Sequence, residues 1–225
     1  MTGMHKRRFD VVTVQAPMQP IIGALFETIY APLLEPLYHQ CVDWILSVTE
    51  DTPFYVIDIG CGPGALADIL LERSRNLSWV GVEPSAYFAR KLSKKVKQSS
   101  DRAIVYQESA ETFDFHRYPG AVVVSLGSIK HWTDPLSACQ AIKRCAPRGL
   151  WISEVCSQAT PVQCKAFVNP SSSWLRRAVA WQFEHRIVPR GIEATTLQRV
   201  LEQSGLRPHA IEHSGPFVLA VSQWK

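Results

Sequence analysis

The most informative segment of the 225-residue chain reads Val56-Ile-Asp-Ile-Gly-Cys-Gly-Pro-Gly64. A short apolar run leads directly into three glycines at alternate positions, and helical spacing follows over Ala65–Arg73. Glycine lets a backbone turn sharply and approach a ligand closely, and a helix N-terminus presents free N–H groups to polar ligand atoms. The segment therefore predicts a buried strand, a ligand-binding loop and a helix, in that order.

Two acidic residues accompany the glycine loop. Asp58 lies inside an otherwise apolar strand, where a carboxylate is costly unless it has a partner. We expect it either to organise the loop or to reach a cationic ligand. Glu83 ends the next expected strand, about 20 residues after the glycines, and suits a ribose with two free hydroxyls. Because Gly60, Gly62 and Ala65 also satisfy the relaxed dinucleotide fingerprint G-x-G-x-x-A, a nicotinamide cofactor stays open at this point.

Strand and helix signals alternate through the middle of the chain, an order that predicts a parallel sheet with helical crossovers. A helical start over 20–48 should be divided at Pro32 and Pro36. A late helix over Thr195–Ser204 should end at Gly205, and Gly215-Pro216 should join a terminal hairpin. The expected strands are Tyr55–Ile59, Ser78–Val82, Ala103–Gln107, Ala121–Leu126, Leu150–Val155, Pro208–His213 and Phe217–Gln223, and the further helices are Ser85 to about Lys97 and Pro135–Cys145.

The composition predicts one globular domain over 1–225. Hydrophobic residues make up 46% of the chain, enough for a sizeable core. The net charge of +4 is mild and argues against nucleic acid as a partner. Six cysteines without a C-x-x-C pair read as free thiols in a reducing compartment. Because neither a signal peptide nor a run of about 18 apolar residues is visible, we expect a cytoplasmic protein without a membrane partner. The oligomeric state stays open.

Three segments together resemble a known family. Residues 58–64 resemble motif I of class I methyltransferases that use S-adenosylmethionine (SAM), and Glu83 resembles their ribose-binding acid. Residues 122–135, Val-Val-Val-Ser-Leu-Gly-Ser-Ile-Lys-His-Trp-Thr-Asp-Pro, are similar to the fourth-strand segment of the ubiquinone/menaquinone methyltransferase-like branch. The resemblance covers roughly residues 40–156 and 194–224. It implies a Rossmann-like α/β fold: a mostly parallel seven-stranded sheet in the order 3-2-1-4-5-7-6, with an antiparallel last strand and helices on both faces.

The same resemblance implies SAM as cofactor and S-adenosylhomocysteine (SAH) as product. The glycines would line the methionine and ribose end, Asp58 would lie near the amino group, and Glu83 would bind the ribose hydroxyls. Ser109 replaces the aspartate that the family often has near the adenine, so adenine recognition would rest on backbone N–H groups. The implied cofactor-binding residues are Asp58, Gly60, Cys61, Gly62, Gly64, Glu83, Pro84, Ser109, Ala110, Ser125 and Leu126.

Methyl transfer requires mainly alignment of the reactants and exclusion of water. A general base helps when the nucleophile carries a proton, and His131, just after the fourth strand, is the candidate. The alternative is that His131 packs against the sheet or caps a loop. Ser125 stands where metal-dependent relatives need a carboxylate, so we predict no metal. The Asn/Asp-Pro-Pro-aromatic motif of exocyclic-nitrogen nucleic-acid methyltransferases is also missing there.

Two segments should cover the site: an N-terminal helical cover over 1–48 and a substrate lid over 157–193. The lid holds four aromatic and five basic residues. They favour either an aromatic-walled pocket for an anionic or aromatic small molecule or an amphipathic helix over Ser173–His185 that packs its aromatics on the core. The candidate substrate contacts are Tyr30, Trp174, Arg177 and Trp181.

The leading hypothesis is a metal-independent SAM-dependent methyltransferase that acts on an oxygen, nitrogen or carbon atom of a small molecule. The alternatives are a catalytically inactive SAM-binding regulator or partner protein, and a nucleotide-dependent Rossmann oxidoreductase. The sequence names neither the acceptor nor the pathway.

Overall fold

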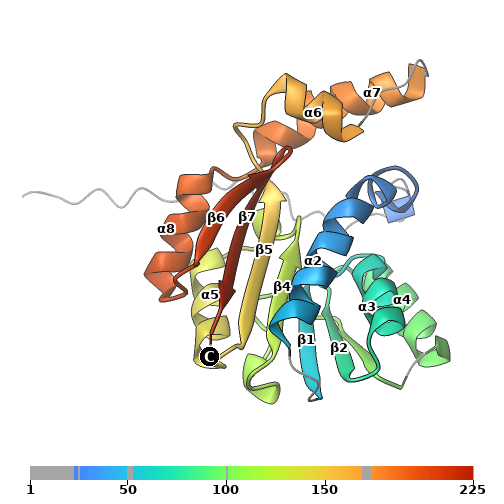
Figure 1. Cartoon of the computed structure of the whole chain (residues 1–225). Helices are drawn as coiled ribbons and strands as arrows, with labels where there is room; N and C mark the ends of the chain where they lie inside the picture. The colour runs from blue at the N-terminus through green and yellow to red at the C-terminus, as the bar shows by residue number, and fades with distance from the viewer. Residues whose placement is uncertain (1–22, 25, 50–52, 100, 169–173, 225) are drawn as a thin grey trace, which may run out of the picture.

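A computed structural model describes residues 23–24, 26–49, 53–99, 101–168 and 174–224 (Figure 1). Seven strands form one sheet in the order β3-β2-β1-β4-β5-β7-β6. Neighbouring strands are parallel, except that β7 runs antiparallel to both β5 and β6. The strands are β1 (Phe54–Ile59), β2 (Leu77–Val82), β3 (Ala103–Tyr106), β4 (Val122–Leu126), β5 (Gly149–Val155), β6 (Ala210–Ser214) and β7 (Phe217–Gln223). The predicted fold, including its strand order, is confirmed.

The central strands are apolar because both faces of the sheet are covered. Val122, Val123 and Val124 of β4 are fully buried. The cluster on one face combines side chains of α2, α3 and α4, and the cluster on the other face combines those of α5 and α8. These helices are α2 (Glu35–Val48), α3 (Ala65–Arg73), α4 (Ala86–Ser99), α5 (Pro135–Arg144) and α8 (Ala194–Ser204).

Proline and glycine mark the element ends where the sequence predicts them. Pro32 begins the short helix η2 (Pro32–Leu34), and Pro36 lies in the first turn of α2, where its missing N–H costs nothing. Gly205 ends α8 with a φ of 81°, and Gly215 turns the hairpin with a φ of 55°. The first 22 residues of the expected N-terminal cover lie outside the described part of the chain.

The segment after β5 is more helical than its sequence indicates. It forms α6 (Pro161–Val168) and α7 (Trp174–Gln182), and α7 continues into η5 (Phe183–Ile187) and η6 (Val188–Arg190). Phe167 and Phe217 meet with ring centroids 5.0 Å apart, and Phe167 and Phe183 with centroids 5.1 Å apart. These contacts fasten the helices above the carboxyl end of β5 (Figure 1). Residues 169–173 of the expected lid lie outside the described residues.

Three short helical turns complete the described elements: η1 (Phe26–Tyr30), η3 (Phe115–Arg117) and η4 (Ile129–His131). No helix in the described ranges is long and apolar enough to cross a membrane. All six cysteines are buried free thiols, consistent with their expected state.

Candidate cofactor site

The glycine loop joins β1 to α3 at the carboxyl edge of the sheet. Gly60, Gly62 and Gly64 have φ angles of 70°, 52° and 81°, a left-handed region in which other residues are strained. The Gly60 N–H donates to the Val82 carbonyl at 2.7 Å, and the Gly64 N–H donates to the Cys61 carbonyl at 2.9 Å. The loop is therefore held against β2 by its own backbone.

Glu83 follows β2, and its carboxylate holds the glycine loop in place through a hydrogen bond. Its exposed fraction is 6%, and its two oxygens accept separate backbone N–H groups: Oε2 that of Gly62 at 2.9 Å and Oε1 that of Ser85 at 2.8 Å. Burial raises the pKa of the carboxyl, and the two N–H groups oppose that rise. Each carboxylate oxygen keeps a further lone pair. The carboxylate is thus positioned to accept two hydroxyl groups from a ligand.

Asp58 lies near the end of β1 and is 3% exposed. Desolvation raises its pKa to about 7, and the charge of Glu83 adds to the rise. The indole of Trp79 opposes the rise, although no side chain or loop N–H in the described ranges makes a hydrogen bond of good geometry with the carboxylate. Tyr38 and Cys41 of α2 lie close enough that the charge of Asp58 adds to the rise that burial causes in their own pKa values.

The two acids therefore divide the roles that the sequence left open for Asp58. The loop N–H groups donate to Val82, Cys61 and Glu83, so the described structure assigns the organising role to Glu83. Asp58 is a buried carboxylate beside the loop whose ionised form lacks sufficient partners. A cationic ligand group would supply one.

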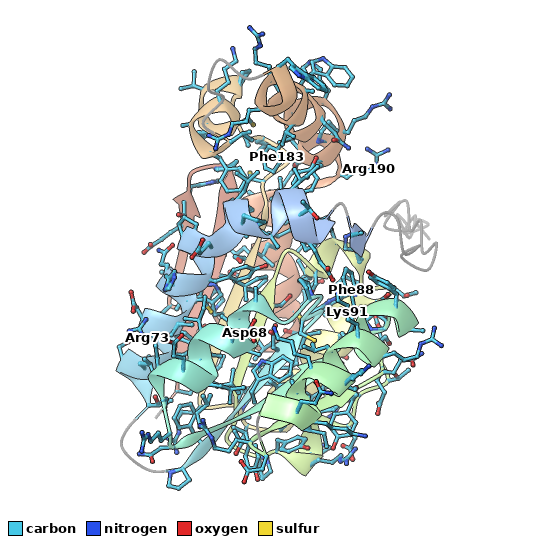
Figure 2. All side chains as sticks on the ribbon, turned by 90° about the vertical axis from the view of Figure 1, so that its right-hand side faces the viewer. Asp68, Arg73, Phe88, Lys91, Phe183 and Arg190 are labelled. Carbon is cyan, nitrogen blue, oxygen red and sulfur yellow. The ribbon has the colours of Figure 1, made fainter. Side chains whose placement is uncertain are left out.

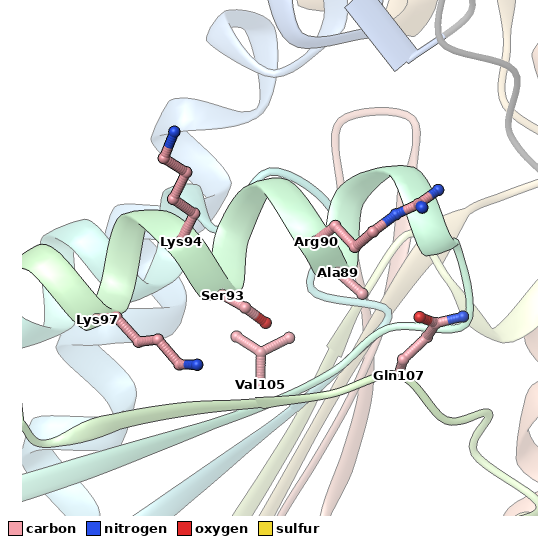
Figure 3. Close-up of a pocket in the computed structure, with 7 residues that line it drawn as sticks. All are labelled: Ala89, Arg90, Ser93, Lys94, Lys97, Val105 and Gln107. Carbon is pink, nitrogen blue, oxygen red and sulfur yellow. The ribbon is translucent and has the colours of Figure 1, made fainter.

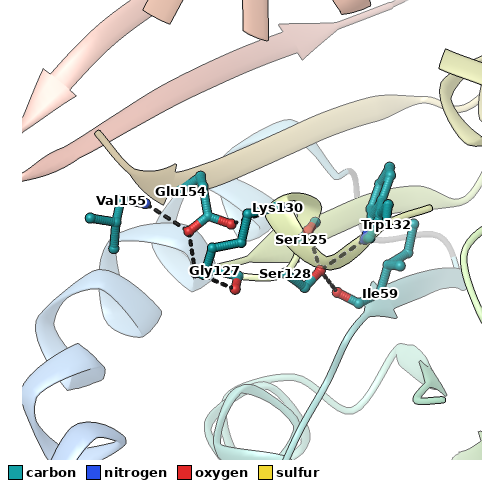
Figure 4. A network of polar contacts seen from close by, with 8 residues as sticks. All are labelled: Ile59, Ser125, Gly127, Ser128, Lys130, Trp132, Glu154 and Val155. Atoms are coloured by element: carbon teal, nitrogen blue, oxygen red, sulfur yellow. Dashed lines mark hydrogen bonds and ion pairs between the residues drawn. The ribbon is translucent and has the colours of Figure 1, made fainter. Parts of the chain in front are cut away.

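Ser128 connects the tip of β4 to the glycine loop (Figure 4). Its Oγ donates to the Ile59 carbonyl at 2.7 Å and lies 2.7 Å from Ser125 Oγ and 3.2 Å from Trp132 Nε1. A hydroxyl has one proton, so Ser125 and Trp132 must donate to Ser128. Sequence reasoning missed Ser128. The sequence did offer a signal: Ser128 closely follows the expected fourth strand, and Ser125 lies at the end of that strand. In the structure Ser125 is fully buried at the same edge of the sheet.

A buried ion pair holds the turn that follows β4. Glu154 of β5 is fully buried, and its Oε1 lies 2.5 Å from Lys130 Nζ and accepts the Val155 N–H at 2.8 Å. The Lys130 N–H donates to Oε2 at 3.2 Å, and Lys130 Nζ donates to the Gly127 carbonyl at 3.0 Å (Figure 4). Glu154, like Asp58, is an acid inside an apolar strand. That signal could have marked it in the sequence.

His131 follows this turn and is exposed. Partial desolvation lowers the pKa of its imidazole and the charge of Lys130 lowers it further, while Glu154 opposes them. The side chain is therefore mostly neutral at pH 7 and able to accept a proton. The role of His131, as a base or as a residue that packs or caps a loop, stays a prediction.

The remaining cofactor candidates surround the loop. The Ser109 N–H donates to Thr112 Oγ1 at 3.1 Å, so in this state it is already engaged, and Ala110 is buried beside it. Leu126 is half-buried, and Pro84 is exposed. Burial holds the pKa of the Cys61 thiol well above its usual value, which indicates a packing role for the sulfur.

The N-terminal helical turn covers the start of α4. A Cβ on Gly23 would lie 2.6 Å from the Tyr87 ring, and the rings of Phe26 and Phe88 lie 6.5 Å apart. Glu27 forms an ion pair with Lys91, which Figure 2 shows on α4 together with Phe88. Tyr30 is half-buried in the same turn. Its buried hydroxyl has no hydrogen-bond partner among the described residues.

The other candidate substrate contacts are not brought to this site. Trp174, Arg177 and Trp181 lie on α7 and are exposed to solvent, with exposed fractions of 74% for Trp174 and 54% for Trp181. The aromatics that turn inward are Phe167 and Phe183. The inward packing of these two rings matches the amphipathic-helix interpretation in part, whereas the outward tryptophans do not, and the role of a substrate lid stays a prediction.

A surface groove of about 400 Å³ lies on another part of the molecule, between α4 and the edge strand β3 (Figure 3). Arg90, Lys94 and Lys97 line it from the helix, and Val105 and Gln107 line it from the strand side. It does not include the glycine loop.

Comparisons with known proteins agree with the observed fold. Residues 56–149 match a family model described as a methyltransferase domain. A solved structure from Methanococcus maripaludis, described as a candidate SAM-dependent methyltransferase, is 21% identical, covers 99% of this chain and 97% of its own, and has a TM-score of 0.66. A SAM-dependent methyltransferase from Aquifex aeolicus is 13% identical over 80% of this chain and 88% of its own, with a TM-score of 0.57.

A third similar structure is the plantazolicin methyltransferase BpumL in complex with SAH. It is 12% identical and covers 83% of this chain and 69% of its own, with a TM-score of 0.61. No curated protein sequence matches the chain significantly. At these identities the likeness concerns the fold. The chain carries the fold of SAM-dependent methyltransferases, and its segment 56–149 matches a methyltransferase domain. The ubiquinone/menaquinone-like branch stays a prediction.

The glycine loop gives a matched pair of stability predictions. A Cβ on Gly60 would lie 2.3 Å from the Cβ of Ser128, whereas a Cβ on Gly62 would meet no atom within 4 Å. Gly62→Ala should therefore cost only the left-handed strain of about 1–2 kcal/mol, and Gly60→Ala about 3 kcal/mol or more because overpacking adds to the strain. Urea unfolding measures both. Equal losses would mean that Ser128 does not press on the loop.

Asp58 should destabilise the folded protein at neutral pH. Its pKa is raised from 3.8 to about 7 on folding, so the folded state binds the proton more tightly, and stability is lost as the pH rises from about 4 to 7. Asp58→Asn should be more stable than the wild type by about 4 kcal/mol at pH 8, or roughly 8–16 °C in Tm, with a smaller gain at pH 5.5. Thermal unfolding at the two pH values tests this. A gain independent of pH would rule out the ionisation of Asp58 as its cause.

Proposed function

We propose that this protein transfers a methyl group from SAM to a small-molecule acceptor and releases SAH. The observation that carries the proposal is the carboxylate of Glu83, held by the Gly62 and Ser85 N–H groups beside three left-handed glycines. This arrangement presents two acceptor oxygens, and a glycine backbone that is open at Gly62, at the carboxyl edge of a parallel sheet, where open α/β sheets bind ligands.

The described residues account for the chemical features of SAM. Glu83 would bind the two ribose hydroxyls, and Asp58 would meet the positive charge of the methionine amino group. Gly60, Gly62 and Gly64, with Cys61, would lie along the ribose and methionine. Pro84, Ser109 and Ala110 would border the adenine, with Ser109 exchanging its bond to Thr112 for one to the ring. Ser125 and Leu126, at the end of β4, would lie beside the methyl group.

SAM supplies an electrophilic methyl group, so the chain has to bind, orient and exclude water. Ser128 and the Lys130–Glu154 pair fix the β4 end and the following turn, which keeps the floor of the site rigid. We propose His131 as the general base, because a neutral exposed imidazole directly after this turn can accept the acceptor's proton. Tyr30, whose buried hydroxyl lacks a partner among the described residues, is proposed as an acceptor contact.

Several finer points belong to the same proposal. The acceptor atom is an oxygen, nitrogen or carbon of an anionic or aromatic compound, and no metal takes part. Trp174, Arg177 and Trp181 stay proposed contacts for an acceptor that extends from the cofactor site to the outer side of α7. Six buried thiols fit a reducing compartment such as the cytoplasm.

The sheet favours this proposal over an oxidoreductase, because the antiparallel β7 between β5 and β6 is the pattern that the family resemblance implies. An inactive SAM-binding protein would share every feature of the cofactor site. A panel of phenols, carboxylic acids, amines and activated carbon acids, assayed for SAH formation, separates the two. We expect turnover with at least one class and none in Glu83→Ala. SAM binding without turnover on the whole panel would favour the inactive binding protein.

Glu83 should control cofactor affinity. Glu83→Ala removes two charge-assisted hydrogen bonds to the ribose, each worth about 1.5–3 kcal/mol, so the Kd for SAM should rise about 100-fold or more. Asp68→Ala is the control, since Asp68 is an exposed acid whose pairing with Lys95 lies on the outer surface. Calorimetry measures both. An unchanged Kd in Glu83→Ala would place the ribose elsewhere.

SAM affinity should rise with pH up to about 7 and then level off. Asp58 is half-protonated near pH 7 in the free protein, and a cationic amino group favours its ionised form, so binding expels a proton below that pH. Repeating the titration in buffers of different ionisation enthalpy counts the released protons. Asp58→Asn should bind more weakly and without this pH dependence. A pH-independent affinity in the wild type would contradict a contact between Asp58 and the amino group.

A further inference from the structure

The outer side of α7 displays two tryptophans to solvent. Trp174 is 74% exposed and Trp181 is 54% exposed, although tryptophan is on average a strongly buried residue. They are seven residues apart, close to two helical turns, so both lie on one side of the helix, about 10 Å apart along its axis. The ring of His185 stacks on Trp181 with centroids 5.0 Å apart and extends the same surface.

The opposite side of the helix packs against the body of the protein. Val179, Ala180 and Phe183 are buried, and Phe183 packs on Phe167 beside Phe217. Figure 2 shows Phe183 on the side of the helix that faces the body of the protein. The two tryptophans therefore take no part in the packing that holds α7 in place, and both stay more than half exposed, Trp181 even with the His185 ring stacked on it.

Positive charge surrounds this aromatic surface. Residues 160–190 contain five basic side chains and one acidic one, so this segment alone carries +4, equal to the net charge of the entire chain. Arg177 lies between the tryptophans on the same side of the helix, and Arg186 and Arg190 are exposed on the turns that follow. On α6, Val162 adds an apolar side chain with an exposed fraction of 76%. The helices α6 and α7, which carry most of these residues, project beyond the carboxyl end of β5 (Figure 1).

We propose that the surface formed by Trp174, Arg177, Trp181 and Arg186 docks on an anionic lipid bilayer, in contrast to the sequence-based expectation of a protein without a membrane partner. Tryptophan is enriched at the boundary between hydrocarbon and water, because its large ring is apolar and its N–H is polar. Basic residues at that boundary are attracted to anionic headgroups. The helix is too short to span a bilayer, so it would lie in the interface plane. This proposal does not depend on methyl transfer.

A docking surface for another protein would be expected to pair apolar anchors with mixed charges. Here the segment offers cations almost alone, which complements a surface of uniform negative charge better than a mosaic one. The aromatic anchors are few and widely spaced, which suits shallow insertion into headgroups. These two properties favour a lipid surface.

The test is sedimentation of the full chain with vesicles of phosphatidylcholine, with and without about one-quarter phosphatidylglycerol. We expect binding to the anionic vesicles, weakened by added salt because screened charges attract less. Trp174→Ala with Trp181→Ala should weaken it about tenfold or more through lost apolar contact. Arg177→Ser with Arg186→Ser should weaken it about 25-fold, at roughly fivefold for each near-surface charge.

The matched control is Lys94→Ser with Lys97→Ser in the groove of α4, which removes the same charge from a different surface (Figure 3). We expect it to bind the vesicles like the wild type, and thermal unfolding confirms that each variant is folded. The proposal is overturned if the wild type does not bind anionic vesicles, or if the control loses as much binding as the arginine variant. Equal binding by the tryptophan variant and the wild type would overturn it too.

Discussion

The site depends on one buried carboxylate that accepts two backbone N–H groups. Glu83 joins the end of β2 to the glycine loop through Gly62 and to the start of α4 through Ser85. Charge-assisted bonds of this kind are stronger than neutral ones, and their low exposure protects them from competing water. Because Glu83 is held in place before a ligand arrives, its remaining lone pairs are already oriented. A ribose would meet a prepared acceptor rather than order one at its own entropic cost.

Three acidic residues at the carboxyl edge of the sheet differ in how well the protein compensates their buried charge. Asp58, Glu83 and Glu154 are all buried in or beside strands. Glu154 is compensated by Lys130, and Glu83 by two N–H groups. Asp58 lacks comparable partners among the described residues, and its pKa of about 7 reflects that deficit. Ligand sites are where such deficits are expected, because the missing partner is the ligand. The amino group of the proposed cofactor would supply the positive charge that Asp58 lacks among the described residues.

Much of the fold can be predicted from the sequence. Parallel strands that are buried on both faces must be continuously apolar, and glycine and proline mark the ends of the elements. Val122–Val124, Gly205 and Gly215 each act as their residue types predict. The contacts within the site are harder to predict from the sequence. Asp58 and Glu83 stand out as acids in apolar strands, but the sequence does not reveal that Glu83 organises the loop. Ser128 acts through contacts with residues distant in the sequence, such as Ile59 and Gly60, which no local pattern encodes. The outward direction of Trp174 and Trp181 likewise follows from the inward packing of Val179 and Ala180 on the opposite side of α7.

The most direct test of the account is a calorimetric titration of the purified protein with SAM, SAH and NAD(P)H. We expect SAM and SAH to bind with micromolar affinity and the nicotinamides to give no response, because the glycine loop, Glu83 and Asp58 together match a cationic amino-acid nucleoside. Binding of NAD(P)H without binding of SAM would contradict the account and leave a nucleotide-binding sheet with a different chemistry.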